Sequence, residues 1–541
     1  MIFWIHSHDT VSAAACFIFY LLVKILVANQ NRRGIWRKTT MSSFEEPNEN
    51  VPTEWMTVLD IDELSRKDNV QYVWKGSRVL PRARDPKSQN GKRVTRALIS
   101  LSKQQGSSSS TTKDPNNVVL REFDLLSCGF VANNELPFVI PDESKTRACY
   151  KSRDILLIGS DYKFPPSKGD ALTDAGYPRT IREWVRGTSL EDAPIVFEGE
   201  KSDITVFSYI DDQRIRGGGI YEVRTRVMSL NRNIHYVRKI KYEHLLVDDD
   251  PKREEAAPGL GDPPEFKQIH VPSDADVDFV GNLLMITLRS DWKPEAGKVF
   301  RAGSLIYVNA HKFIKYGPKD RIYHVLFEPT ATKCLENYTS TQKFVILSII
   351  DNAVQSKLEF YKLQKDANKL RIVGCDKQSI IRTVNVRAVD PYENDKFWFT
   401  TTSYIEPTTL WLGDASKVDS DDKRTLRRVS PDVYQMKKLK QLPSHFDSSN
   451  LMVIQKFASS LDGTKVPYCM IMKKDTVLNK KNPTLLYGYG GFEVSLGPNY
   501  LSAVGCAWLE RSGVYVEANI RGGGEFGPTW HEVRLIVLLF Q

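Results

Sequence analysis

Residues 484–492 read TLLYGYGGF, and residues 514–527 read VYVEANIRGGGEFG. Each stretch is a short apolar run that leads directly into glycines, as a strand does when it ends in a tight loop. The residues between them predict a helix, which Gly513 could cap. One face of that helix would carry four apolar residues: Leu501, Val504, Trp508 and Leu509. Strand, helix, strand is a βαβ unit, so a parallel sheet is predicted here.

The two loops that follow these strands are unusually rich in glycine. Residues 488–527 contain 10 of the 32 glycines in the chain. Such density indicates backbone that needs positive φ or that must approach a ligand closely. The loops are therefore the first place to look for a functional site.

The region from about Glu54 to Asp432 predicts many short strands and little helix. The strands are β-branched and aromatic, and Gly, Pro, Asn and Asp separate them. They are Thr57–Ile61, Val70–Lys75, Ala97–Leu101, Val118–Phe123, Ile155–Ile158, Thr180–Val185, Ile195–Glu198, Ile204–Tyr209, Tyr221–Val227, Leu284–Leu288, Leu305–Val308, Phe344–Ile349, Leu358–Leu363, Lys396–Thr400 and Thr409–Leu412. So many strands exceed one sandwich, and radial repetition into propeller blades would protect their edges. The sequence therefore predicts an all-β propeller, followed after Pro443 by the part that contains the parallel sheet.

Charge and cysteine usage exclude several classes of protein. The 541 residues carry a formal charge of +9, and residues 1–40 alone contribute +4 of it. The positive charge that remains for the rest of the chain is too small to indicate nucleic-acid binding. The seven cysteines are widely spaced without a CxxC pair, which predicts neither a zinc site nor a disulfide framework and favours a reducing compartment.

An apolar run of 18 residues, Val11–Ala28, is interrupted by Ser12 and Lys24. Its length is near the lower limit for a helix that crosses about 30 Å of hydrocarbon. No Lys or Arg precedes it, which argues against a secretory signal. If it spans a membrane, the basic residues behind it place the bulk of the chain in the cytoplasm. The alternative is a weakly structured extension.

Three enzyme motifs are approached without being completed. Gly522, Gly524 and Gly527 match the GxGxxG of a dinucleotide loop, but Pro528 follows at once and no acidic residue stands about 20 positions later. His531-Glu532 begins an HExxH zinc motif that fails, because residue 535 is leucine. No GxSxG nucleophile motif occurs anywhere in the sequence.

The glycine-rich stretches closely resemble the prolyl oligopeptidase family of serine peptidases. The resemblance rests on Tyr487–Phe492, Ala518–Gly527 and Trp530-His531. Ser460–Pro467 looks like the start of the hydrolase domain of that family. Upstream, the segments that look like its propeller are Val73-Trp74, Arg96–Ser102 and Val119–Asp124. The resemblance covers about residues 54–532.

The resemblance implies a seven-bladed β-propeller that caps an α/β-hydrolase domain. It implies a cytoplasmic enzyme that cleaves short peptides, commonly after proline, without a metal or cofactor. One catalytic role of the family falls on a residue present here: Tyr489 would donate its phenol hydroxyl to the oxyanion of the tetrahedral intermediate. A preorganised donor at developing charge contributes about 3–4 kcal/mol to catalysis.

The remaining catalytic residues have no counterpart in this chain. The triad of α/β-hydrolases runs Ser, Asp, His in chain order, and in this family all three follow the motif that ends at Gly527. Only 14 residues follow Gly527, and Val533–Phe540 (VRLIVLLF) no longer resembles the family. We therefore expect nucleophile, acid and base to be absent, and the chain as given to be inactive.

Two hypotheses follow from this absence. The first is a truncated member of the family, whose complete form is a cytoplasmic serine peptidase acting on peptides. The alternative is a non-catalytic propeller protein that binds peptides or protein partners. In either case we expect a monomer, without a nucleic-acid partner, that is membrane-anchored only if residues 11–28 span.

The expected organisation is an all-β seven-bladed propeller plus an incomplete α/β-hydrolase domain. Residues 1–53 would be an N-terminal extension outside the family pattern, containing the candidate membrane segment 11–28. Residues 54–440 would be the propeller, and residues 441–532 a partial peptidase domain. Residues 533–541 would be a divergent apolar tail.

Overall fold

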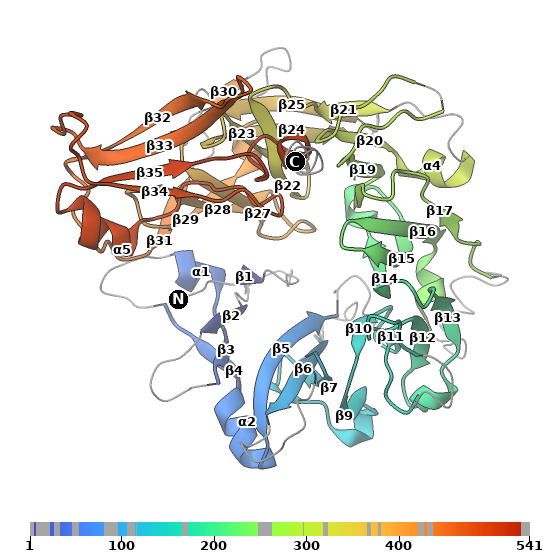
Figure 1. Cartoon of the computed structure of the whole chain (residues 1–541). Coiled ribbons are helices and arrows are strands. Elements are labelled where there is room, and N and C mark those ends of the chain that lie inside the picture. The colour runs from blue at the N-terminus through green and yellow to red at the C-terminus, as the bar shows by residue number, and fades with distance from the viewer. Residues whose placement is uncertain are drawn as a thin grey trace. The chain divides into compact units, whose positions relative to one another are not determined.

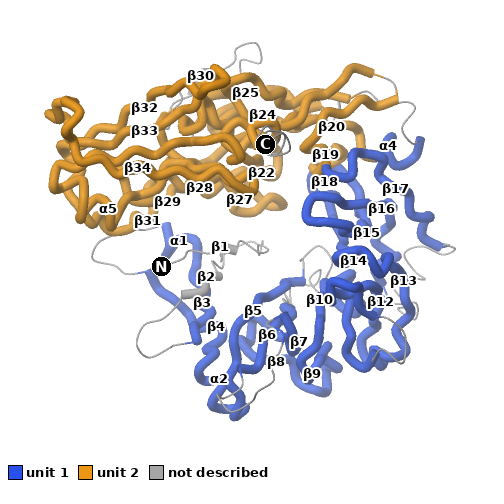
Figure 2. Tube along the Cα trace, viewed as in Figure 1, with its two compact units in different colours: residues 1–274, 311–317 blue, residues 275–310, 318–541 orange. Residues whose placement is uncertain are grey.

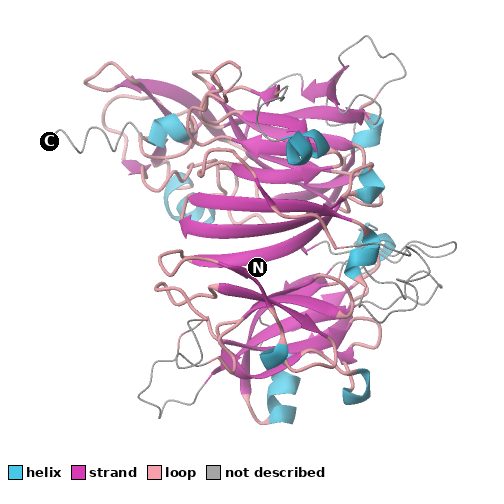
Figure 3. Cartoon of the chain, turned by 90° about the vertical axis from the view of Figure 1, so that its right-hand side faces the viewer, coloured by secondary structure: helices cyan, strands magenta, loops and turns pink. Residues whose placement is uncertain are grey.

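Two compact units make up the structure, a computed structural model (Figure 2). The first comprises residues 1–274 and 311–317, and the second residues 275–310 and 318–541. Strands make up most of the regular structure in both (Figure 3). The structure describes residues 5–6, 22–25, 33–45, 53–80, 96–104, 114, 116–164, 171–246, 262–295, 297–316, 323–364, 369–376, 380–419, 427–429 and 436–531.

The first unit contains four antiparallel sheets among its described residues, each built from strands that follow one another in sequence (Figure 1). The first sheet has β1 (Ile5–His6), β2 (Leu22–Ile25), β3 (Ile35–Lys38) and β4 (Met56–Asp60). The second has β5 (Gln71–Val79), β6 (Arg96–Gln104), β7 (Val118–Asp124), β8 (Gly129–Phe130) and β9 (Val139–Ser144). The third has β10 (Arg147–Tyr150), β11 (Ile155–Gly159), β12 (Thr180–Val185) and β13 (Ile195–Glu198). The fourth has β14 (Thr205–Asp212), β15 (Ile220–Ser229), β16 (Arg232–Ile240) and β17 (Lys267–Gln268).

Helices are few in this unit. They are α1 (Met41–Glu45), α2 (Ile61–Asp68) and α4 (Ala310–Tyr316), whose first residue belongs to the second unit. Helix α2 begins where it does because the carboxylate of Asp60 accepts the N–H groups of Asp62 and Glu63.

The sheets pack face to face, so many strands are buried on both sides. Successive side chains of a strand point to opposite faces. In β11, Leu156 therefore packs with Leu98 of β6, while Leu157 packs with Val206 of β14. This double burial explains why Ile155–Ile158 is apolar at every position instead of alternating.

The second unit continues the pattern with three further antiparallel groups of strands. The first has β18 (Asp276–Val280), β19 (Leu283–Thr287), β20 (Leu305–Asn309) and β21 (His324–Phe327). The second has β22 (Lys333–Ser340), β23 (Phe344–Asp351), β24 (Gln355–Gln364), β25 (Lys369–Asp376) and β26 (Ile380–Ile381), with β30 (Arg427–Val429) added in parallel to β25. The third has β27 (Thr383–Ala388), β28 (Lys396–Thr402), β29 (Thr409–Asp414) and β31 (Lys437–Gln441). Here too the strands serve two cores, since Val345 and Ile346 of β23 belong to different clusters.

A mixed sheet follows in the same unit, in the order β32-β33-β35-β34. Strands β32 (Leu451–Ser459) and β33 (Lys465–Lys473) form a hairpin. Strands β34 (Thr484–Gly488) and β35 (Val514–Ala518) lie parallel, in the register Gly488 to Ala518, which confirms the predicted parallel pair. Its hydrophobic core includes Ile471 and Tyr515 together with Tyr404, which lies two residues beyond β28.

The predicted helix between β34 and β35 is shorter and wider than expected. It consists of α5 (Ser502–Val504) followed by a π-helical turn, Gly505–Leu509. The left-handed residue that ends it is Ser512, with φ 65°, so the expectation that Gly513 provides this cap is wrong. Glycine is required at 513 for space, because a Cβ there would lie 2.5 Å from Nε1 of Trp508.

The expected division at residue 53 falls inside a sheet. Strand β3 precedes it and β4 follows it, and the two pair antiparallel. Trp36 of β3 is buried in the same cluster as Val58 and Tyr72. Of the candidate membrane segment 11–28, only Leu22–Ile25 is described, as strand β2. Among the described residues, none of the helices has the length and apolar character needed to cross a membrane. The apolar tail 533–541 lies outside the described residues.

Candidate active site

The candidate site lies at the carboxyl ends of β34 and β35 (Figure 1), where the sequence places both glycine-rich stretches. We call residues 488–497 the first glycine loop and residues 519–527 the second. Because parallel strands end at the same edge of a sheet, both loops emerge there together. Ligands of open parallel sheets bind at such edges.

The backbones of the two loops approach each other closely. A Cβ at Gly490 would lie 2.8 Å from Cγ1 of Ile520 and closer still to the carbonyl oxygen of Arg521. Only glycine fits this position, because any Cβ would collide with the second loop. The N–H of Glu493 also donates to the carbonyl oxygen of Gly522 at 3.3 Å.

His531 ties both loops to the segment that follows them. Its Nδ1 lies 2.8 Å from the carbonyl oxygen of Gly522 and 3.2 Å from the backbone nitrogen of Glu493. The N–H of Gly522 in turn donates to the carbonyl oxygen of Trp530 at 3.0 Å. His531, which begins the incomplete HExxH pattern, thus contacts the backbone of both glycine loops.

Tyr489 stands in the first glycine loop with its side chain 37% exposed. Its phenol folds over the next glycines, since a Cβ at Gly491 would lie 3.2 Å from the tyrosine hydroxyl oxygen. A tyrosine hydroxyl can donate one hydrogen bond to a bound group. The role assigned to Tyr489 from the sequence stays a prediction.

Two buried side chains of the second loop hold the first loop in place. Oε1 of Glu525 accepts the N–H of Leu496 at 2.9 Å, and Nδ2 of Asn519 donates to the carbonyl oxygen of the same leucine at 2.7 Å. Glu525 and Asn519 are fully buried. Burial raises the pKa of the Glu525 carboxyl, because the charged form loses its hydration.

A third anchor comes from the turn between β32 and β33. Arg521 of the second loop forms an ion pair with Asp462, and its Nη2 donates to the hydroxyl of Ser460 at 3.1 Å. The pKa of Asp462 is lowered to about 2 by the backbone N–H of Thr464 and then by Arg521. The contacts of Arg521 therefore connect the second glycine loop to Ser460–Pro467, the segment that resembles the start of a hydrolase domain.

Residues of the antiparallel sheets of the second unit also reach the loops. Nη1 of Arg289, just beyond β19, lies 2.9 Å from Oε2 of Glu493. The thiol of Cys334 in β22 donates to the carbonyl oxygen of Glu525 at 3.2 Å, and burial raises its pKa to about 12. Sequence reasoning missed both residues, since no local pattern marks them.

A buried carboxylate lies beneath the site, in β35. Glu517 accepts the hydroxyl of Tyr404 at 2.7 Å and that of Tyr515 at 3.1 Å. Burial raises the pKa of Glu517. The pKa of Tyr404 is raised as well, by burial and then by its neighbours Cys469 and Glu517. These groups are enclosed in the hydrophobic core, which indicates a structural role.

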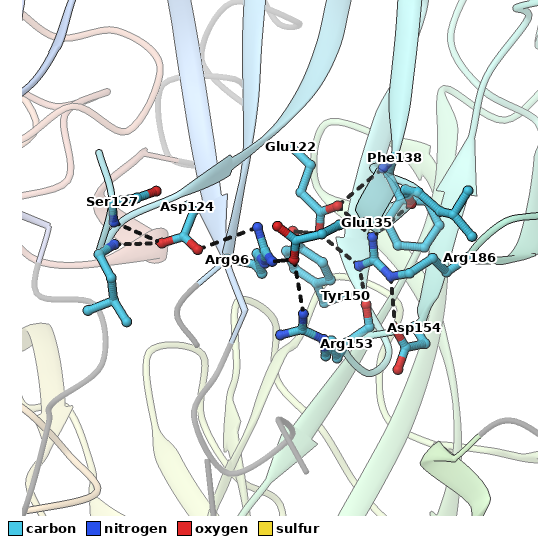
Figure 4. Close-up of polar contacts among 12 residues, drawn as sticks. Arg96, Glu122, Asp124, Ser127, Glu135, Phe138, Tyr150, Arg153, Asp154 and Arg186 are labelled. Carbon is cyan, nitrogen blue, oxygen red and sulfur yellow. Dashed lines mark hydrogen bonds and ion pairs between the residues drawn. The ribbon is translucent and has the colours of Figure 1, made fainter. Parts of the chain in front are cut away.

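A separate polar cluster is confined to the first unit (Figure 4). Glu122 of β7 is fully buried, and its carboxylate accepts three hydrogen bonds. Nη1 and Nη2 of Arg186 donate at 2.7 and 2.9 Å, and the hydroxyl of Tyr150 donates at 2.9 Å. Glu135 nearby pairs with Arg96. Because these partners come from two neighbouring sheets, the cluster links the sheets as a buried ion pair does.

Among known proteins, this chain is similar in sequence to peptidases. No family model matches it. An uncharacterized peptidase of Sinorhizobium fredii is 29% identical over 506 residues, which cover 93% of this chain and 59% of the relative. A prolyl endopeptidase of Elizabethkingia meningoseptica is 38% identical over 135 residues, which cover 25% of this chain and 17% of that enzyme.

Solved structures agree with these relatives. A post-proline cleaving enzyme of Rickettsia typhi superposes with a TM-score of 0.70 at 24% identity, over 95% of this chain and 65% of that one. A prolyl endopeptidase superposes with a TM-score of 0.60 at 18% identity, over 98% of this chain and 64% of that one.

Along almost its whole length, then, the chain is similar to peptidases and shares their fold. Its relatives and structural neighbours include prolyl oligopeptidases and post-proline cleaving enzymes, the family that the two glycine-rich motifs resemble. The chain spans about three fifths of the length of the two curated relatives that it matches along 93% of its own residues.

Proposed function

We propose that this chain is the propeller and oxyanion-binding part of a serine peptidase that cleaves short peptides after proline. The observation that carries the proposal is the position of Tyr489. Tyr489 is partly exposed in the first glycine loop, which contacts the second loop at the carboxyl ends of β34 and β35, in a chain similar to peptidases.

The chemistry expected of Tyr489 is electrostatic. Attack on a peptide carbonyl moves negative charge onto its oxygen, and a fixed hydroxyl donor stabilises that oxyanion more than the uncharged carbonyl. Fixation comes from the anchors described above: Leu496 held by Glu525, and Glu493 held by Gly522. A donor held in this way needs no reorganisation when the charge develops.

The propeller part of the proposal rests on the topology. Seven antiparallel groups of strands precede β32 among the described residues, each formed from consecutive strands, and neighbouring groups share hydrophobic cores. Seven such groups match the number of blades in the family. The family that the chain resembles acts on short peptides, which is why we propose oligopeptide substrates.

We further propose that the catalytic serine, aspartate and histidine lie outside these 541 residues, in a longer form of the protein. The support is the order of the family motifs, in which the triad follows the second glycine loop, together with the lack of a GxSxG segment in the sequence. The chain as given would then bind peptide without cleaving it.

Sequencing the mature transcript and probing both proteins with a fluorophosphonate tests the proposal. We expect the transcript to continue into a GGSxGG-type segment, and the longer product to react with the probe and to cleave a chromogenic peptide with proline before the scissile bond. The 541-residue chain should remain unlabelled, since labelling requires an activated serine. If the transcript stops at codon 541 and the product binds peptides without labelling, the non-catalytic propeller protein is the correct description.

A further inference from the structure

Two arginines of the buried cluster in the first unit, Arg96 and Arg186, differ in how completely their side chains are paired (Figure 4). A guanidinium group carries five N–H donors. Arg186 makes five hydrogen bonds, to the carboxylates of Glu122 and Asp154 and to the carbonyl oxygens of Leu136 and Arg153. The pairing of Arg186 is therefore complete, as expected of a buried cation with a structural role.

Arg96 lies at the start of β6 and is 3% exposed, yet most of its donors lack acceptors. Its Nη2 donates to the carboxylate of Glu135. Its Nη1 lies 3.5 Å from Oδ2 of Asp124, whose other oxygen accepts the N–H groups of Leu126 and Ser127. Among the described residues, neither Nη1 nor Nε of Arg96 has a hydrogen-bond partner. Because unpaired buried donors cost free energy, these donors indicate a place for a further acceptor.

The carboxylate that pairs with Arg96 is itself half-exposed. Figure 4 shows Glu135 between Arg96 and Arg153. Its Oε2 contacts Nη2 of Arg96 and lies 3.9 Å from Nη2 of Arg153, which is 6% exposed. The Glu135 side chain, in contrast, is 47% exposed, and it belongs to the short turn Asn133–Glu135 between β8 and β9. Rotation of this one side chain into solvent would uncover both guanidinium groups without moving a sheet.

The group that replaces Glu135 has to restore its single negative charge, since a buried cation without its partner is strongly destabilising. A carboxylate does so and has two oxygens, which match the fork of N–H donors on a guanidinium group. One oxygen can take the place of Glu135 on Nη2 of Arg96. The other can accept from Nε, the donor beside Nη2 in the fork. A ligand carboxylate would thus satisfy a donor that Glu135 leaves unpaired.

We propose that Arg96 and Arg153 form a binding site for the carboxylate of a ligand, and that Glu135 occupies this site in the free chain. The carboxylate belongs either to a small organic acid or to the C-terminus of a peptide. Glu135 then acts as an internal competitor that the ligand has to displace. The proposal concerns the first unit alone and does not rest on peptidase activity of the protein.

Titration calorimetry of the 541-residue chain with N-acetyl-triglycine and with acetate tests the proposal. Glu135→Gln should bind N-acetyl-triglycine at least about tenfold more tightly than the original chain, because binding no longer has to displace a carboxylate. Glu198→Gln is the matched control. Glu198 is 50% exposed and also pairs with an arginine of the first unit, Arg179, and its replacement should leave the affinity unchanged.

The two probes distinguish the sources of the carboxylate. Acetate that binds as tightly as N-acetyl-triglycine assigns the site to small organic acids, whereas tighter binding of the peptide assigns it to peptide C-termini. The C-terminal amide of the same peptide should not bind. Equal affinity for the amide overturns the proposal, since the carboxylate would then not be the group that is recognised.

A second substitution tests the location of the site. Arg96→Met, made together with Glu135→Gln, should weaken binding at least about tenfold, and Arg153→Met replaces it if that chain does not fold. Retained affinity in the folded double variant overturns the proposal, as does equal affinity in Glu135→Gln and the original chain. The original chain offers a measurement without any variant: its unfolding temperature should rise with N-acetyl-triglycine and not with the amide. No rise at saturating peptide also overturns the proposal.

Discussion

The carboxylate of Glu525 accepts the backbone N–H of Leu496 at 2.9 Å, although the two residues belong to different glycine loops. Glu525 is fully buried, and its contact determines where the first loop lies relative to the second. The loop that carries Tyr489 is thus held from below by a side chain 36 positions further along the chain.

Glu525→Ala should lower the free energy of unfolding of the 541-residue chain by about 1–3 kcal/mol, because it leaves a buried N–H without its acceptor. Glu525→Gln keeps an acceptor oxygen and removes the cost of a buried charge, so it should be much milder. Urea unfolding at neutral pH measures both. Equal losses for the two variants would show that the hydrogen bond to Leu496 is not what Glu525 contributes.

Tyr489→Phe, made in the complete peptidase, should lower kcat by about 10²–10³-fold with little change in KM, because the lost donor acts on the transition state. Steady-state cleavage of a proline-containing chromogenic peptide measures this. Tyr487→Phe is the control, since Tyr487 lies two residues earlier, at the end of β34, and is also partly exposed. An unchanged kcat in Tyr489→Phe would remove the oxyanion role from this residue.

The hydrogen bond from the N–H of Thr464 to Asp462, and then the ion pair between Asp462 and Arg521, predict acid sensitivity. The pKa of Asp462 is about 2 in the folded chain, below its ordinary value of 3.8. A lowered carboxyl pKa contributes stability that is present above the ordinary value and is lost as the pH falls through the folded value.

We therefore expect Asp462→Asn to flatten the loss of stability between about pH 4 and pH 2, measured by urea unfolding across that range. Asp475→Asn, which removes an exposed carboxylate just beyond β33, should keep the slope of the original chain. Coincident profiles for all three proteins would rule out the Asp462 carboxylate as the source of the acid sensitivity.

The buried cluster of the first unit predicts a large effect from one carboxylate. Glu122→Ala leaves Arg186 and the Tyr150 hydroxyl without their shared acceptor, and should cost about 3–5 kcal/mol. Glu122→Gln preserves the shape and one acceptor and should cost less. Thermal and urea unfolding give the comparison, and a loss below 1 kcal/mol in Glu122→Ala would mean that water replaces the carboxylate.

Local sequence pattern predicted the apolar strands closely. Thr180–Val185 and Ile195–Glu198 coincide with β12 and β13, and the parallel pair β34 and β35 lies where the glycine-rich stretches begin. Strands β16 and β22 were missed, because RNIHYVRKI and KCLENYTS are too polar to read as buried strands. Their main-chain hydrogen bonds to apolar neighbours hold them in the sheets instead.

The candidate site was predictable only in part. Tyr489 was predicted as a site residue because it lies in a short motif, beside the glycines of its own loop. Arg289 pairs with Glu493 at a separation of 204 residues, and no periodicity or spacing records such a contact. The role of Gly513 was misjudged for a similar reason, since the cause is the position of the Trp508 ring and not the end of the helix.

By itself, the sequence determined the resemblance to a peptidase family, the sheet-rich fold and the strand–loop pairs of the site, because alternation, glycine placement and short motifs act over a few residues. Only the tertiary structure decided which side chains hold those loops: Glu525 and Asn519 from within the motif, and Arg289 and Cys334 from distant strands. The reason is physical. Local pattern specifies which backbone a segment prefers, whereas these contacts arise from the way whole sheets stack on one another.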